Sequence, residues 1–418
     1  MPTTDRHWTN LEKTGFRILF VFVLLFMLTL SEHTTYLPSL RVWTDVYFEQ
    51  AVLWTGNHLF QLPAGYTSQL SSDSTGALIH VFNIGIIAIL FGLSTFRIQL
   101  DYPKAWYWFS VVVSYYLALQ LLLYGFNKVF KCQFFIPEPN TLYTTVGETP
   151  RDLLFWSVMG SAYGYTVFGG ILEVIAGCLL LLRRTRLLGA LMAFGILSNV
   201  VAINFGFNIS VKLYSSFYCF LAVLLIAAQA KRLYAFFIQN KHLSNNLWFP
   251  SYRPNQQKIY ASTKIFIVWL LFFEALAPYF ANHNFNDDTQ TRPAFHGAYT
   301  VQSFVQNNIP FPPVEGYAFR WKRAFVHRRG YFIVQTMDDK MQDYHFEYDR
   351  QAQLFRLTHP ISHKEYWLDY SQPNAQTLLL KGELDEQQVQ IRLSSLDWQQ
   401  LPLLQQEFHW TIDGLKEG

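Results

Sequence analysis

The sequence predicts a protein of two parts: an α-helical polytopic membrane domain of about seven spans, followed by a mostly antiparallel β soluble domain. Three observations lead to this prediction. Seven apolar stretches between residues 14 and 280 are long enough for helices that cross a bilayer. Lys and Arg gather in alternate gaps between these stretches. After residue 280 the apolar runs become short and are separated by turn residues, which is typical of β strands.

The composition supports a membrane domain. The chain is 51% hydrophobic and only 15% charged, whereas soluble domains carry roughly 25% charged residues. The net charge of +3, with no basic stripe in the tail, argues against a nucleic-acid partner. Cys132, Cys178 and Cys219 form neither a Cys-x-x-Cys pair nor a zinc spacing with histidine. We therefore expect no metal site and no thiol-disulfide chemistry.

The first apolar stretch begins near Arg17 and lacks a small-residue cleavage site, which favours an uncleaved span over a signal peptide. Residues 42–60 mix aromatic and polar side chains, and we expect a helix along the membrane interface. Residues 131–157 carry Pro137, Pro139, Gly147 and Pro150, which predict an irregular outer loop. The predicted spans are 14–31, 76–97, 105–127, 158–182, 186–204, 211–230 and 261–280.

The distribution of positive charge predicts the orientation. Fourteen Lys and Arg residues flank the spans in one set of alternate gaps, and five lie in the other set. Positive charge stays in the cytoplasm during insertion, so the N-terminus is predicted to be cytoplasmic. An odd number of spans then places residues 281–418 outside. The expected location is the bacterial inner (plasma) membrane, with the lipid bilayer as a partner and the tail in the periplasm.

The tail predicts an antiparallel meander, either a sandwich or a partly closed barrel. Turn residues occupy 337–340, 349–351 and 385–386. The tail shows no catalytic-triad spacing and no phosphate loop, so we expect a binding or assembly module. The predicted strands are 331–335, 344–348, 354–357, 377–380 and 389–393.

Polar side chains recur along one face of the third span. In the predicted orientation this face descends from the outer surface towards the middle of the membrane. Lys128 lies beside it and adds a positive charge. The residues at helical spacing are Tyr116, Gln120, Tyr124, Asn127 and Lys131.

The fourth span carries a carboxylate, Glu173, on a face with Gly170 and Gly177. Small residues let helices approach closely, so Glu173 is predicted to face another helix. An intramembrane carboxylate is costly and indicates function by default. Two interpretations stay open. Glu173 either locks helix packing through hydrogen bonds, or acts directly in ligand binding or proton transfer, as the candidate catalytic residue.

Further polar residues fall in the predicted outer half of other spans, and this shared side predicts a polar cavity open to the periplasm or outer leaflet. Lys128, Lys131 and Lys212 either reach up to lipid headgroups or donate hydrogen bonds to an anionic ligand or to quinone carbonyls. The additional candidate ligand-binding residues are His80, Asn199, Asn204, Lys212 and Glu274.

Residues 119–233 resemble the DoxX-like membrane proteins, whose core is a four-helix bundle. The resemblance rests on Tyr124-Gly125-Phe126-Asn127-Lys128-Val129-Phe130, on the segment from Phe168 to Gly177, and on Arg183-Arg184-Thr185-Arg186. The family's Gly-x-x-Lys pattern corresponds to Gly125 and Lys128, and its Glu with Gly four residues later corresponds to Glu173 and Gly177. The extra leading spans and the β tail look like the longer DoxX-like proteins of Bacteroidetes-type bacteria.

The resemblance implies a link with membrane redox systems, because some relatives are subunits of thiosulfate:quinone oxidoreductase and others accompany methylamine-dehydrogenase maturation. This chain lacks a cysteine pair and any haem, flavin or iron–sulfur signature. As an oxidoreductase-associated subunit, it would pass electrons through a bound quinone or a partner. The resemblance divides the chain into N-terminal spans and an outer loop (1–104), the DoxX-like core (105–235), a cytoplasmic linker (236–260), the last span (261–280) and the extracytoplasmic β domain (281–418).

Three functions follow as hypotheses. The first is a redox-associated membrane protein that binds a quinone or other lipid-like ligand in the outer half of the bundle, with Lys128, Tyr124 and Asn199 as donors and Glu173 as proton acceptor. The second is a non-catalytic envelope assembly or docking component whose β domain, 281–418, binds a periplasmic protein partner. A transporter ranks last, because no paired broken helices or inverted repeats are visible.

Overall fold

The computed structural model describes residues 8–30, 34–38, 41–241, 253–314, 316–317 and 319–405. The chain forms two compact units. The helical unit combines the residues up to 133 with residues 166–285. The β unit combines residues 134–165 with the chain from 286 onwards.

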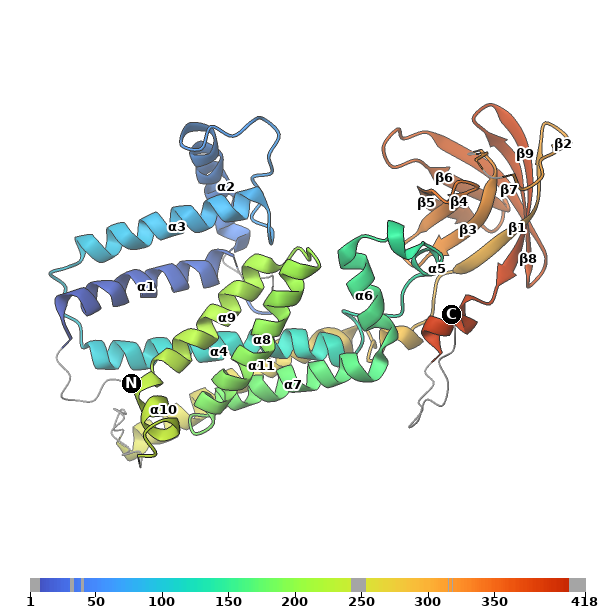
Figure 1. The fold of residues 1–418 in the computed structure, drawn as a ribbon. Helices are drawn as coiled ribbons and strands as arrows, with labels where there is room; N and C mark the ends of the chain where they lie inside the picture. Colours follow the sequence, from blue (N-terminus) through green and yellow to red (C-terminus); the bar gives the residue numbers. More distant parts are fainter. Residues whose placement is uncertain are drawn as a thin grey trace. The chain divides into compact units, whose positions relative to one another are not determined.

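The helical unit contains a helix at every predicted span (Figure 1). The predicted span 158–182 begins later than expected, because one helix ends at Ser161 and the next starts at Tyr163. The bounds are α1 Asn10–Thr29, α2 Arg41–His58, α3 Thr75–Ser94, α4 Tyr102–Val129, α7 Tyr163–Leu181, α8 Arg186–Gly206, α9 Lys212–Ala227, α10 Ala230–Phe237 and α11 Pro254–Ala281.

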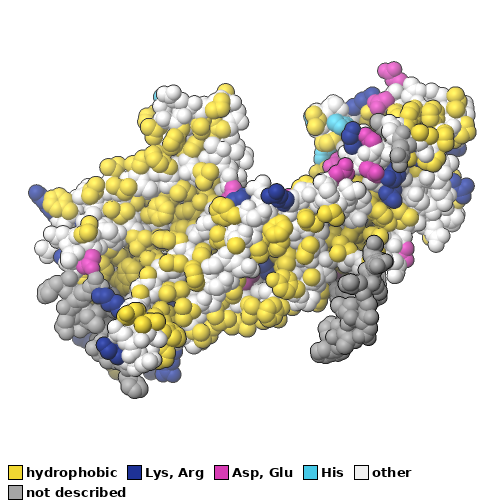
Figure 2. All heavy atoms as spheres, viewed as in Figure 1, with side chains coloured by type: hydrophobic (Ala, Val, Ile, Leu, Met, Phe, Trp, Pro, Cys, Tyr) yellow, Lys and Arg dark blue, Asp and Glu magenta, His cyan; other side chains and the backbone are white. Residues whose placement is uncertain are grey.

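The protein is embedded in a membrane. Among the described residues, the five helices α3, α4, α7, α8 and α11 are long and apolar enough to span a bilayer. A sixth span results if α9 and α10, which meet at a bend of 65°, count as one. Many large apolar side chains are exposed on these helices, as the yellow surface in Figure 2 shows. The first predicted span, in α1, carries Glu12, Lys13 and Arg17 in its first turns, and a total of seven spans stays a prediction.

Local sequence signals explain where the helices begin. Thr9 and Glu12 form a capping box at the start of α1. Ser74 accepts a hydrogen bond from the amide of Ala77 and so caps α3. Asp101 does the same for Lys104 in α4. The helix predicted in residues 42–60 is present as α2, and its position along the membrane interface stays a prediction.

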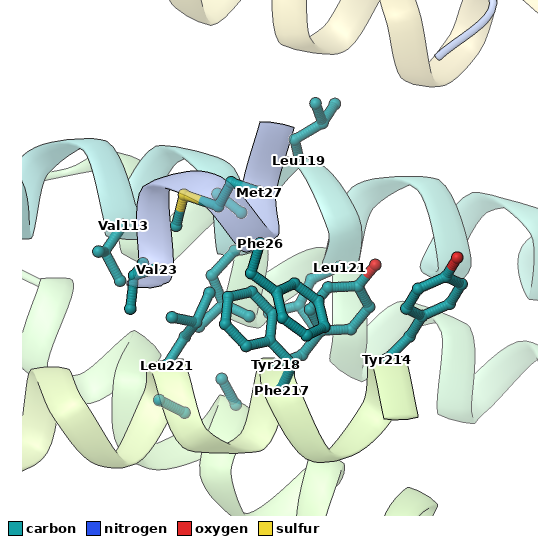
Figure 3. Packing of buried hydrophobic residues seen from close by; sticks show 14 of the residues in the cluster. Val23, Phe26, Met27, Val113, Leu119, Leu121, Tyr214, Phe217, Tyr218 and Leu221 are labelled. Carbon is teal, nitrogen blue, oxygen red and sulfur yellow. The ribbon is translucent and has the colours of Figure 1, made fainter. Parts of the chain in front are cut away.

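The core of the helical unit combines aliphatic side chains with an aromatic stack. Phe26 of α1 stacks on Phe217 of α9, with ring centroids 3.7 Å apart (Figure 3). Val113 and Leu117 of α4 are fully buried in the same cluster. These side chains fix α4 between α1 and α9, and α4 carries most of the candidate site.

The β unit is a closed antiparallel barrel, since β1 pairs with both β3 and β9 and every strand from β3 to β9 pairs with the next. The short strand β2 pairs antiparallel with the end of β1. All five predicted strands are confirmed, whereas β1, β3 and β7 were not predicted. The bounds are β1 Gly297–Gln306, β2 Ile309–Pro310, β3 Trp321–His327, β4 Tyr331–Thr336, β5 Met341–Asp349, β6 Leu354–Thr358, β7 Glu365–Asn374, β8 Thr377–Leu384 and β9 Gln387–Leu396.

Alternate strand residues point into the barrel and fill it. Phe304, Phe332, Phe355, Leu380 and Ile391 belong to one buried cluster, as expected for a small barrel whose interior is just wide enough for side chains. The predicted turn at 385–386 is confirmed. Asp385 and Glu386 both have positive φ, which suits the two-residue turn of a hairpin.

The prediction of an irregular loop at 131–157 is wrong in part. The segment contains α5 (Pro139–Leu142), a short 3-10 turn (Val146–Glu148) and the start of α6 (Arg151–Ser161). The prolines that favoured a loop stand at helix starts instead. Pro139 occupies the first turn of α5, and Pro150 precedes α6 directly. Proline fits these positions because the first amides of a helix need no intrahelical acceptor.

Candidate functional site

A buried ion pair joins α4 to α7. Lys128 Nζ lies 2.8 Å and 3.0 Å from the two carboxylate oxygens of Glu173. Lys128 is 9% exposed and Glu173 is 3% exposed. The sequence predicted both residues as site residues, and the structure brings them together.

Glycines allow the two helices to approach closely enough for this pair. A Cβ atom on Gly170 would lie 2.6 Å from the carbonyl oxygen of Gly125 and 2.8 Å from Lys128 Cβ. A Cβ on Gly125 would lie 2.9 Å from the carbonyl oxygen of Gly170. All three separations are too short for real atoms. The Gly-x-x-Lys and Gly-x-x-Glu patterns therefore form a single crossing, with the charges one turn from the glycine contact.

Aromatic and polar side chains continue the contacts of the ion pair along α4 and onto α9. Lys128 Nζ lies 5.5 Å from the ring centroid of Tyr124, within the range of a cation–π contact. The Tyr124 ring lies 6.4 Å from that of Tyr218 on α9. Tyr218 donates a hydrogen bond of 3.1 Å to Gln120 Oε1. We call these five residues, from Glu173 through Lys128, Tyr124 and Tyr218 to Gln120, the polar chain.

The polar chain offers both kinds of hydrogen-bonding group. An ammonium and a phenol donate, and a carboxylate accepts. Removing the two charges of Lys128 and Glu173 from water costs several kcal/mol each, which their attraction offsets only with close geometry. The observed distances provide that geometry. The sequence did not identify Tyr218, because its spacing in α9 resembles that of ordinary core aromatics.

Two further members of the predicted α4 stripe are Asn127 and Lys131. Asn127 Oδ1 accepts a hydrogen bond of 2.8 Å from Tyr279 on α11, so it holds a different pair of helices together. Lys131 is completely buried and adopts a positive φ of 56° just after α4 ends. The stripe thus serves several neighbours of α4 rather than one.

Other predicted ligand-binding residues form separate local contacts. Asn204 Nδ2 donates to Ser215 Oγ at 3.0 Å. His80 Nε2 lies 2.8 Å from Thr29 Oγ1. Asn199 is exposed on α8. These residues are not gathered with the polar chain, and their role in binding a ligand stays a prediction.

Lys212 begins α9 and pairs with Asp73 at 3.3 Å. Asp73 also accepts hydrogen bonds from the backbone amides of Lys212 and Leu213, at 3.0 Å and 2.8 Å. A carboxylate in this position caps the positive end of a helix. Asp73 was not predicted, although it stands in the polar run just before α3.

Glu274 of α11 is fully buried. Its carboxylate accepts hydrogen bonds from three successive backbone amides, those of Thr35, Tyr36 and Leu37. These three amide donors satisfy the hydrogen-bonding capacity of the buried carboxylate. Glu274 therefore fastens the segment after α1 to α11.

A second buried charge cluster lies in the β unit and was not predicted. Glu138 is 4% exposed. It accepts hydrogen bonds from His296 at 3.0 Å and from the amide of Arg328 at 3.2 Å, and it also pairs with the Arg328 guanidinium. Burial raises the pKa of the Glu138 carboxyl, but these bonds and the Arg328 charge outweigh it and bring that pKa to about 2. The cluster fastens residues 134–165 to the barrel.

Metal ligation has no support in the part of the chain that the structure describes, since no group of three or more His, Cys, Asp or Glu residues there is placed to hold an ion.

Comparison with known proteins gives one informative match. No family model and no solved structure matches the chain. It is 30% identical over 124 residues to the uncharacterized protein YwoB of Bacillus subtilis (strain 168). The match covers 30% of this chain and 79% of that protein. The chain therefore belongs to the same family as YwoB.

Proposed function

We propose that this is an integral membrane protein of the DoxX-like type that binds a quinone or a similar lipid-like ligand at the polar chain, in the outer half of its helix bundle. The observation that carries the proposal is the buried ion pair between Lys128 and Glu173. Two apolar side chains of similar size would hold α4 and α7 together with no loss of stability. A charged pair at such a place is expected to have a chemical role.

The groups of the polar chain suit a quinone. The Lys128 ammonium and the Tyr124 hydroxyl are donors for a quinone carbonyl. The Glu173 carboxylate is an acceptor for the hydroxyl of the reduced form. In a redox-associated role these residues would bind the ring and exchange its protons. The electrons would come from a protein partner.

The test is a quinone titration of the purified full-length protein in a mild detergent. A water-soluble short-chain ubiquinone analogue is added, and its binding is followed by quenching of tryptophan fluorescence. We expect saturable binding to the wild type and at least a tenfold weaker affinity in Glu173→Gln and Lys128→Met. Gly169→Ala is the control, because a Cβ on Gly169 would meet no atom within 4 Å.

Equal affinity in the wild type and both variants would contradict the proposal, provided that all of the proteins stay monodisperse. Binding that is lost equally in Gly169→Ala would show that the variants act through general disturbance of α7.

The outer face of the barrel favours a second function, docking of a protein partner. Trp367 of β7 is 49% exposed, and the Arg356 guanidinium lies 5.4 Å from its ring. Arg356 also pairs with Glu347 and Glu365 on the neighbouring strands. Exposed Trp and Arg are enriched among the residues that dominate protein interfaces. A photo-crosslinker at position 367 should then capture one partner in cells, and a crosslinker at the opposite-facing position 368 should not.

A further inference from the structure

A cavity of about 1190 Å³ lies at the other end of the helical unit. Its walls are formed by the start of α4, the turn from α7 to α8, the end of α9, and helices α10 and α11. Along α4, Ser110 in this cavity is eighteen residues from Lys128, a rise of about 27 Å. The cavity is therefore distinct from the polar chain.

The cavity is strongly cationic. Its lining includes five positive residues and, among the described residues that form it, no Asp or Glu. The buried Nε atoms of Arg186 and Arg232 have no hydrogen-bond partner among the described residues. A buried guanidinium nitrogen without an acceptor is costly, and an anionic oxygen would remove that cost. The five residues are Arg183, Arg184, Arg186, Arg232 and Lys264.

Most of the remaining wall is apolar, although Ser110, Thr185 and Gln229 also line it. Leu188, Leu225, Leu233 and Trp106 line it, together with Phe236 from α10. Helix α10 turns by 65° from α9 and combines Lys231 and Arg232 with exposed aromatic residues. A helix of this composition is typical of the membrane interface. Figure 2 shows Lys and Arg side chains gathered around this end of the helical unit.

We propose that this cavity binds a phosphate group with a double negative charge, carried by an anionic lipid. The arginines supply charge-assisted hydrogen bonds to the phosphate oxygens. The apolar wall takes the upper part of the acyl chains. A soluble phosphate compound shares the headgroup chemistry but leaves the apolar wall uncovered. The proposal does not depend on a quinone at the polar chain.

The test uses full-length protein in a neutral detergent with three probes: dioleoyl phosphatidic acid, dioleoyl phosphatidylcholine and inorganic pyrophosphate. Native mass spectrometry counts bound lipid, and thermal unfolding reports stabilisation. We expect phosphatidic acid to bind and to raise the Tm, with affinity at least tenfold weaker in the double variant Arg186→Gln/Arg232→Gln. Arg97→Gln is the matched control, because Arg97 is exposed in the turn after α3 and does not line the cavity.

Each outcome decides one part of the proposal. Equal binding of phosphatidic acid to the wild type and the double variant, or equal binding of phosphatidylcholine, would overturn it. Pyrophosphate that binds and fully displaces phosphatidic acid would support the phosphate site and overturn the lipid as its source. If the double variant does not fold, Lys264→Gln on the α11 wall replaces it, with the same expected weakening and the same contradicting result.

Discussion

At the scale of single residues, breaking the ion pair between Lys128 and Glu173 should lower the free energy of unfolding by a measurable amount. The two side chains are buried and bonded at 2.8 Å and 3.0 Å. Loss of one partner leaves an uncompensated charge, which typically costs about 3–5 kcal/mol. We expect Lys128→Met to lower the free energy of unfolding by that amount, measured by denaturation with SDS in mixed micelles.

The double variant Lys128→Met/Glu173→Met should recover most of this loss, since apolar pairs replace buried ion pairs without penalty. Two single variants that are as stable as the wild type would mean that the pair is hydrated or open in the membrane.

Glu138 predicts a pH dependence of the β unit. Its folded-state pKa of about 2 lies below the ordinary value of 4.5. A carboxyl with a lowered pKa contributes stability that is complete above pH 4.5 and is lost as the pH falls towards 2. The contribution is at most roughly 3 kcal/mol. Thermal unfolding of full-length protein between pH 6 and pH 2 should show it.

Glu138→Gln is the matched variant for this titration. It should be less stable than the wild type by a constant amount above pH 4.5, and the two curves should converge towards pH 2. A difference that persists undiminished at pH 2 would show that Glu138 acts through packing and not through its charge.

At the scale of elements, the crossing of α4 and α7 depends on glycine. A Cβ at Gly170 would overlap the Gly125 carbonyl oxygen, whereas one at neighbouring Gly169 meets nothing within 4 Å. Gly170→Ala should therefore push the helices apart and weaken the ion pair, with a loss of about 1–3 kcal/mol from overpacking. Gly169→Ala should change stability by less than about 0.5 kcal/mol. Equal effects in SDS denaturation would contradict this crossing.

The sequence predicted the helices well because membrane spans leave a strong signal: length and apolar composition alone locate them. The barrel strands with clear alternation, such as β6 and β9, were also predicted. β7 was not predicted, although its buried residues Tyr366, Leu368 and Tyr370 alternate with exposed ones. The prolines of residues 131–157 led to the incorrect prediction of a loop, because proline is found at helix starts as well as in loops.

The sequence predicted which polar residues share a helix face but not their contacts between helices. Helical spacing placed Gln120 and Tyr124 on one face of α4, whereas Lys131, predicted on the same face, lies just after the helix ends. The partners of such a face come from distant helices, and Tyr218 or Tyr279 has no local signal that distinguishes it from a core aromatic. The pairing of Lys128 with Glu173 needed the crossing of Gly125 and Gly170, which is a tertiary property.

At the scale of the whole molecule, the asymmetry of charge predicts one threading through the membrane. The basic end of the helical unit, with Arg183 and Arg232, should lie in the cytoplasm. Reporter fusions at Asn240 should report the cytoplasm, and fusions after Asn282 should report the periplasm. Alkaline phosphatase and a fluorescent protein are the two readouts. The reverse pattern at both sites would invert the assignment of every loop.

The proposed function depends on a ligand bound at the buried ion pair of α4 and α7. Its most direct test is mass spectrometry of the small molecules retained by gently solubilised protein. The wild type should retain a quinone or similar lipid in stoichiometric amount, and Lys128→Met/Glu173→Met, which we expect to keep the fold, should not. Retention of the same molecule in the same amount by the double variant would contradict a ligand site at this pair.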